Sequence, residues 1–161
     1  MLARVNSVEQ ETLIYRNIRR RNMKVLFLDI DGVINCKTSN FKTDLWPLDR
    51  YMAFLVGKIE MYTDCKVVLS SSWRKHPEGV AIVEKSLAIK LFDITGNEGK
   101  IRGDEIQAWL ERHPEVTRYA ILDDDSDMLE SQLPNFFQTK WETGLTDEIA
   151  EKVISHLNEG V

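Results

Sequence analysis

Two aspartates that directly follow a short apolar run constrain the fold of this chain more than any other feature. Residues 25–28 read Val-Leu-Phe-Leu, which is typical of a strand buried on both faces of a parallel sheet. Asp29 and Asp31 come next and lead into Gly32. Because residues two apart on a strand point the same way, both carboxylates are predicted to face one site at the C-terminal end of the strand. An ordinary Asp-Gly turn is the alternative interpretation.

A second acidic run strengthens the prediction of a site. Residues 119–122 form another short apolar run, and Asp123, Asp124, Asp125 and Asp127 follow it. Two strands that both end in carboxylates bring like charges together, and these repel unless a cation or a shared proton lies between them. Oxygen ligands favour a hard divalent ion, so Mg²⁺ is the expected cofactor.

Apolar runs alternate with stretches of helical periodicity along the chain. We predict strands at residues 25–28, 66–69, about 89–94, 118–122 and 135–138. We predict helices at residues 49–62, from Pro77, at 104–111 and after Thr146. This alternation predicts an α/β fold, a three-layer sandwich with a mostly parallel five-stranded sheet and helices on both faces.

Length and composition indicate one globular domain. The 161 residues carry a net charge of −5, so a nonspecific nucleic-acid binder is not the default. Residues 1–22 hold five arginines and two glutamates, and we assign them to a basic N-terminal extension ahead of a single domain at 23–161. The two cysteines form neither a disulfide framework nor a zinc site, which favours a reducing cytoplasm. No apolar run reaches membrane-spanning length, and no obligate protein partner is evident.

Four segments together resemble the haloacid dehalogenase (HAD) superfamily, most of whose members are phosphatases. Residues 29–33, Asp-Ile-Asp-Gly-Val, match the first motif of that superfamily, and residues 122–124, Leu-Asp-Asp, resemble its fourth, acidic motif. Residues 67–70, Val-Val-Leu-Ser, resemble the second motif. Arg102 is the best match to the basic third motif, with Lys100 as the alternative. The resemblance implies a HAD-like Rossmannoid fold.

The resemblance also implies roles for the aspartates. Asp29 would be the nucleophile that forms an aspartyl-phosphate, and Asp31 would be the general acid/base. Mg²⁺ would be held by Asp29, the main-chain carbonyl of Asp31 and Asp123, with Asp124 as a further or water-mediated partner. Asp127 matches a spacing seen in some members, and a carboxylate at a helix N-terminus is its alternative role.

Phosphate contacts are expected from the second and third motifs. Ser70 is the first candidate to bind a phosphoryl oxygen, and Ser71 and Ser72 remain alternatives because strand alternation does not fix where the strand stops. Arg102 would place a fixed positive charge on the phosphoryl group. Trp73 and Arg74 follow the serines and are possible substrate contacts, although a tryptophan there is more often part of the core.

The spacing of the motifs bears on the substrate. Thirty-eight residues separate Asp31 from Ser70, and 52 separate Ser70 from Asp123, which leaves no room for a large cap domain. Residues 70–74, 102–106 and 121–127 resemble a small group of HAD domains associated with RNA-repair proteins. We therefore expect a Mg²⁺-dependent phosphomonoesterase that acts on a nucleic-acid end or a nucleotide.

Two other functions remain open at this point. A small-metabolite phosphatase or phosphotransferase would use the same residues on a different substrate. A non-enzymatic phospho-acceptor or binding module would also need an aspartate pocket and Mg²⁺. Asp31 argues against the non-enzymatic function, because an acid/base two residues after the nucleophile is needed for turnover and not for phospho-acceptance.

Overall fold

A computed structural model describes residues 12, 22–39 and 47–160. The proposed basic extension at residues 1–22 therefore lies almost entirely outside the described residues. The strands are β1 (Met23–Leu28), β2 (Lys66–Leu69), β3 (Asp93–Ile94), β4 (Val116–Asp123) and β5 (Phe136–Gln138). They form one sheet in the order β3-β2-β1-β4-β5, and every pair is parallel. The predicted α/β fold is confirmed.

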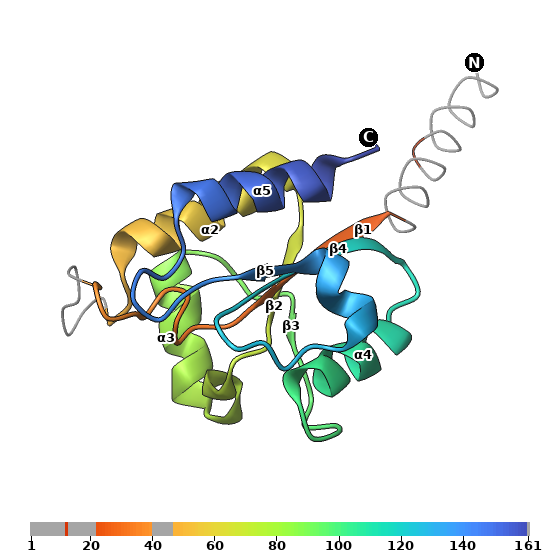
Figure 1. Ribbon diagram of the computed structural model, residues 1–161, viewed down its shortest axis with the longest axis horizontal. Coiled ribbons are helices and arrows are strands. Elements are labelled where there is room, and N and C mark those ends of the chain that lie inside the picture. Colours follow the sequence, from red (N-terminus) through yellow and green to blue (C-terminus); the bar gives the residue numbers. More distant parts are fainter. Residues whose placement is uncertain (1–11, 13–21, 40–46, 161) are drawn as a thin grey trace, which may run out of the picture.

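Helices cover both faces of this sheet (Figure 1). The α-helices are α2 (Arg50–Thr63), α3 (Pro77–Leu87), α4 (Arg102–Glu111) and α5 (Asp147–Asn158), and the 3₁₀ helices are η1 (Ser72–Lys75) and η2 (Glu130–Asn135). Leu26 and Leu28 face a core shared with α2, α3 and α5, whereas Val25 and Phe27 face a core shared with α4. All four side chains are fully buried, which explains the uninterrupted apolar run of β1.

Two predicted boundaries differ from the structure. The third strand was expected at about residues 89–94, but β3 spans Asp93–Ile94 alone. The preceding residues are held by the end of α3: Ala88 has φ +54°, and the Leu91 N–H bonds the Glu84 side chain. Helix α4 begins at Arg102, two residues before the expected start, because the Asp127 side chain accepts a hydrogen bond from the Arg102 N–H.

The order of the strands reverses direction beside β1. From β1 the chain proceeds outward through β2 and β3, then returns to place β4 and β5 on the other side. The C-terminal ends of β1 and β4 therefore flank a topological switch point, where doubly wound sheets bind ligands. The hydrogen bonding of the sheet continues past the ends of β1 and β2. The Asp29 N–H, just after β1, bonds the Leu122 carbonyl at 2.9 Å, and the Ser70 N–H, just after β2, bonds the Leu28 carbonyl at 3.0 Å. These bonds fix where the motif residues emerge.

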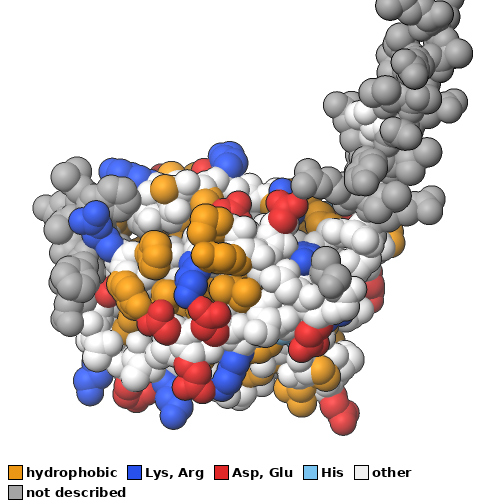
Figure 2. Space-filling view, turned by 90° about the horizontal axis from the view of Figure 1, so that it is seen from above, with side chains coloured by type: hydrophobic (Ala, Val, Ile, Leu, Met, Phe, Trp, Pro, Cys, Tyr) orange, Lys and Arg blue, Asp and Glu red, His pale blue; other side chains and the backbone are white. Residues whose placement is uncertain are grey.

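The surface over α2 and α5 is mixed in character. Figure 2 looks onto this side of the molecule and shows apolar side chains gathered among acidic and basic groups. Tyr51, Phe54, Met61 and Tyr62 of α2 are between 49% and 71% exposed. None of the helices in the described ranges is both long and apolar enough to cross a membrane.

Candidate active site

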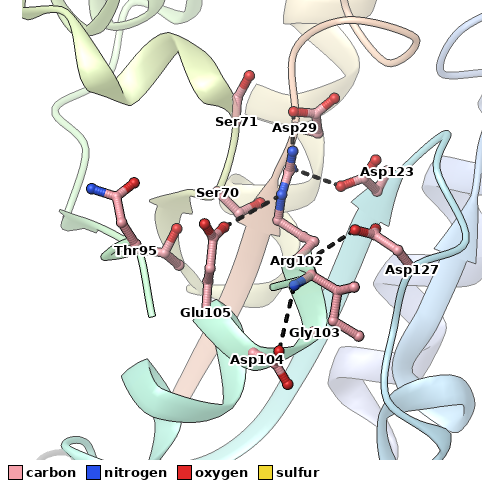
Figure 3. A network of polar contacts seen from close by, with 12 residues as sticks. Asp29, Ser70, Ser71, Thr95, Arg102, Gly103, Asp104, Glu105, Asp123 and Asp127 are labelled. Carbon is pink, nitrogen blue, oxygen red and sulfur yellow. Dashed lines mark hydrogen bonds and ion pairs between the residues drawn. The ribbon is translucent and has the colours of Figure 1, made fainter. Parts of the chain in front are cut away.

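Arg102 joins the acidic ends of β1 and β4. Its Nη1 atom lies 3.0 Å from an Asp29 carboxylate oxygen and 2.8 Å from an Asp123 carboxylate oxygen, and Figure 3 shows the guanidinium between them. Asp29 is 6% exposed and Asp123 is 1% exposed. Burial of such groups disfavours their charge, and the bridging cation offsets part of that cost. The first residue of α4 thus holds two strand ends together.

Burial and like charge act on the carboxylates of this site. Burial raises the pKa of Asp29, and the neighbouring Arg102 opposes that rise. Burial is also the main cause that raises the pKa of Asp123 to about 7, and the nearby Asp29 carboxylate adds to it. Burial and Asp29 raise the pKa of Asp124 as well. For Arg102, burial works against the charge, but Asp123 and Asp29 outweigh it and raise the pKa of the guanidinium.

Three carboxylates are close enough to share a metal ion. Asp29, Asp123 and Asp124 each offer an oxygen, and these oxygens lie within 4.8 Å of one another. An all-carboxylate set fits a hard divalent cation such as Mg²⁺. Gly32 makes room for this arrangement, because a Cβ atom there would lie 2.1 Å from Cγ of Asp124. Gly32 also has φ +78°, a conformation that favours glycine.

Asp31 occupies a different environment from Asp29. Its carboxylate oxygens accept hydrogen bonds from Nε1 of Trp73 at 2.9 Å and from Nδ2 of Asn35 at 2.5 Å. Its side chain does not belong to the three-carboxylate cluster. The main-chain carbonyl of Asp31 as a metal ligand stays a prediction. Two aspartates that are adjacent on one strand end therefore have different partners.

The serines after β2 also differ from one another. Hydrogen bonding from the Ser71 side chain lowers the pKa of Asp29. The Ser71 hydroxyl oxygen accepts the Trp73 N–H at 3.4 Å. Ser70 is fully buried, and its hydroxyl has no hydrogen-bond partner within the described ranges. Ser72 is exposed at the start of η1. Ser71, which was an alternative to Ser70, is thus the serine whose side chain influences the pKa of Asp29.

Arg74 is turned toward the protein interior. Its side chain is 4% exposed, and its guanidinium donates to six acceptors at the C-terminal end of the sheet, five of them in loops and one in α4. The acceptors are the carbonyls of Ser70, Ser71, Thr95 and Gly96 and the side chains of Asn97 and Glu105. All five N–H groups of the guanidinium can be used within this set. The structure thus gives Arg74 a set of internal partners, and its expected contact with substrate stays a prediction.

The third-motif alternatives are separated by their surroundings. Lys100 is exposed, and the structure places its main-chain N–H, rather than its ammonium group, against Asp104 at 2.9 Å. The Arg102 guanidinium is the cation between Asp29 and Asp123. Asp127, which had two possible roles, binds the N-terminus of α4 through the Arg102 N–H at 3.0 Å. Asp127 therefore caps the N-terminus of α4, and not the N-terminus of a helix that begins near Asp127 itself.

Two residues beside the site were not identified from the sequence. Asn35 lies four positions after Asp31 and binds its carboxylate. Thr139, which follows β5, is buried and donates its hydroxyl to the Gly32 carbonyl at 2.7 Å. The only local signal for Asn35 is a polar residue at the end of the apolar pair 33–34. No local signal marks Thr139, because its partner is 107 positions away.

Comparison with known protein families agrees with the resemblance described above. The family model for the HAD domain in Swiss Army Knife RNA repair proteins matches residues 25–150, a range that includes all four motif segments. No curated protein and no solved structure gave a significant match. The match extends over most of the sheet, from β1 to the first turn of α5. The chain therefore belongs to the family of HAD domains found in Swiss Army Knife RNA repair proteins.

Proposed function

We propose that this protein is a metal-dependent phosphomonoesterase that removes a terminal phosphate from a nucleic-acid end or a nucleotide. One observation carries the proposal. At the switch point of the sheet, Asp29 is paired with Arg102 while Asp31, two residues on, is held by neutral donors. A nucleophile beside a fixed cation, with a separate proton donor, is the set of groups that hydrolysis of a phosphate monoester requires.

The first step forms a covalent intermediate. A carboxylate oxygen of Asp29 attacks phosphorus, and the bond between phosphorus and the leaving oxygen breaks as the new P–O bond forms. Asp31 gives its proton to the leaving oxygen, so the product departs as an alcohol and Asp31 becomes a carboxylate. Arg102, which contacts Asp29, and the Ser71 hydroxyl, whose hydrogen bonding lowers the pKa of Asp29, would bind the phosphoryl oxygens.

The second step restores the enzyme. Water attacks the phosphorus of the aspartyl-phosphate while Asp31 takes one of its protons. The bond between phosphorus and Asp29 then breaks, which regenerates both aspartates and releases inorganic phosphate. Asp29, Asp123 and Asp124, with the main-chain carbonyl of Asp31, would hold Mg²⁺, which when bound offsets negative charge on the phosphoryl group.

The family and the open site support a nucleic-acid substrate. The matching family model is described by its occurrence in RNA repair proteins. Within the described residues, the segments between the motifs hold helices and strands of the sheet and no separate cap domain, which favours a site that a large substrate can reach. The arginines among residues 1–22 could contact additional phosphates of a strand.

Phosphate release from a defined panel tests this function. The panel holds 3′- and 5′-phosphorylated oligonucleotides, mononucleotides and sugar phosphates, each with Mg²⁺, and Asp29→Asn is the control. We expect turnover of an oligonucleotide end or a nucleotide that Asp29→Asn abolishes while its circular dichroism stays unchanged. Turnover of sugar phosphates alone would favour a metabolite phosphatase. No turnover of any substrate would contradict the enzymatic proposal and favour a phospho-acceptor.

A further inference from the structure

Two neutral hydrogen-bond donors, one for each oxygen, bind the carboxyl group of Asp31. The indole Nε1–H of Trp73 lies 2.9 Å from Oδ2, and the amide Nδ2 of Asn35 lies 2.5 Å from Oδ1. Trp73 belongs to η1 after β2, whereas Asn35 belongs to the loop after β1. Two donors from separate segments fix both the position and the plane of one carboxyl group.

Each donor is itself held in place. The Trp73 N–H donates to the Ser71 hydroxyl oxygen, and the Trp73 ring packs against the core on one side of the sheet. The Asn35 N–H bonds the Ile30 carbonyl at 2.9 Å, and the Asn35 carbonyl accepts the Gly32 N–H at 2.7 Å. These bonds close the loop after β1 on itself, so the Asn35 side chain returns toward Asp31. Both donors to Asp31 are therefore held in place by the surrounding structure.

We propose that Trp73 and Asn35 are positioning residues that aim the Asp31 carboxyl group at the leaving oxygen of the substrate. This inference rests on the proposed function, in which Asp31 passes its proton to that oxygen. With one lone pair of each carboxyl oxygen bound by a donor, the direction of proton transfer is confined to what remains. Trp73 thus acts through Asp31 and not by stacking on a substrate base.

The leaving group provides a readout that a purely structural role would not affect. An alkyl phosphate needs a proton on its leaving oxygen, whereas p-nitrophenyl phosphate releases a stable phenolate without one. The ratio kcat/KM reports the steps up to departure of the leaving group, so hydrolysis of the phosphoenzyme does not enter it. Loss of aim at Asp31 should therefore slow the alkyl substrate selectively.

Trp73→Phe is the informative variant. It removes the N–H donor but keeps an aromatic ring, which matters because this side chain also lines a cavity of about 290 Å³ with Lys75 and His76. We expect kcat/KM for an alkyl phosphate to fall about tenfold, and kcat/KM for p-nitrophenyl phosphate to change by less than about twofold. Asn35→Ala, from a different loop, should give the same selective loss.

Trp109→Phe is the matched control. The Trp109 indole N–H donates to Asp93 at 2.8 Å, so this variant also removes an indole–carboxylate bond from a buried tryptophan, but away from the catalytic aspartates. We expect it to lower stability without changing the ratio between the two substrates. Asp31→Asn should show the same selectivity as Trp73→Phe with a larger amplitude, and thereby define its full size.

Each outcome decides the matter. Equal losses on both substrates, or no loss on either, would overturn the positioning role while leaving the proposed function intact. If Trp73→Phe fails to fold by circular dichroism, Asn35→Ala carries the same test from the other side. If the wild type turns over neither substrate nor any member of the panel above, the proposed function fails, and the inference fails with it.

Discussion

Two arginines reach the same end of the sheet, yet one binds mostly main-chain carbonyls and the other binds carboxylates. The side chain of Arg74 is 4% exposed, and its guanidinium contacts four main-chain carbonyls. The side chain of Arg102 is 18% exposed, and its guanidinium contacts the carboxylates of Asp29 and Asp123. Arg74 holds loops in place, whereas Arg102 remains in part accessible beside the proposed nucleophile. The same residue type thus stabilises the surrounding loops in one case and belongs to the candidate site in the other.

The two arginines meet at a shared acid. Glu105 of α4 accepts from Nη2 of Arg74 at 2.7 Å and lies 3.7 Å from Nε of Arg102. Figure 3 shows Glu105 on the helix turn next to Arg102. Glu105 therefore links Arg74, which holds the loops, to Arg102, the cation of the site. Variants of Arg74 should mainly change stability, and variants of Arg102 should mainly change activity.

The largest expected effect is the loss of stability in Arg74→Ala. This change leaves the buried carbonyls of Ser70 and Thr95 without the guanidinium donor and removes one of the two donors to the Ser71 carbonyl. It also deprives Glu105 of its closest cation. We expect the free energy of unfolding to fall by about 3–5 kcal/mol, measured by urea denaturation. Arg112→Ala removes an exposed ion pair with Glu98 and is the matched control, with a much smaller loss expected. Similar losses of stability in both variants would contradict the role of Arg74 in holding these loops together.

Arg102→Ala should show the opposite pattern. Without the guanidinium, Asp29 and Asp123 lose the cation that bridges them, and we expect kcat/KM for a phosphate monoester to fall by about 10²–10³-fold. The loss of stability should be smaller than that of Arg74→Ala. Arg102→Lys keeps the charge without the planar fork and should be intermediate. Retained activity in Arg102→Ala would remove this residue from the catalytic set and reopen the case for Lys100.

The two serines sharpen the comparison at smaller scale. Ser71→Ala removes the hydroxyl whose hydrogen bonding lowers the pKa of Asp29, and we expect kcat/KM to fall by about tenfold. Ser70→Ala removes a buried hydroxyl that has no partner within the described ranges, so activity and stability should change little. Steady-state phosphate release and thermal melting of both variants check this. The reverse pattern would restore Ser70 as the phosphate-binding residue.

The smallest expected effect comes from a glycine in the scaffold. Gly57 lies within α2, and a Cβ atom there would meet nothing within 4 Å. Gly57→Ala should raise the free energy of unfolding by up to about 1 kcal/mol without changing activity. Gly32→Ala should lower the free energy of unfolding, because its Cβ would collide with Asp124 and its φ is +78°. Thermal melting of the pair would show whether the site, and not the scaffold, depends on glycine.

Local pattern was sufficient to predict most of the fold. The apolar residues 25–28 and 67–69 predicted β1 and β2, and Pro77 and Thr146 marked the starts of α3 and α5. The third strand was predicted too long, since Ile89 and Leu91 are apolar but bind the end of α3 through Glu84. Apolar character alone does not distinguish a strand from a buried turn.

The site was predictable where motif residues lie at strand ends, and not where long-range partners decide the role. Asp29 and Asp123 could be placed together because parallel strands end at one edge, and both contact Arg102 in the structure. The side chain of Asp31 was expected to face the same site, but it binds Asn35 and Trp73 instead of joining the carboxylate cluster. The roles of Arg74 and Trp73 depend on acceptors far along the chain, such as Thr95 for Arg74 and Asp31 for Trp73. No local sequence pattern carries that information.

The central claim is that Asp29 becomes covalently phosphorylated during turnover. The most direct test mixes the protein with Mg²⁺ and a substrate that it hydrolyses, quenches the reaction in acid on the millisecond scale, and identifies the modified peptide by mass spectrometry. We expect the added mass of one phosphoryl group on Asp29, sensitive to hydroxylamine and absent from Asp29→Asn. A wild-type protein that turns over substrate with no phosphoryl group on Asp29, or an Asp29→Asn variant that remains active, would contradict the account.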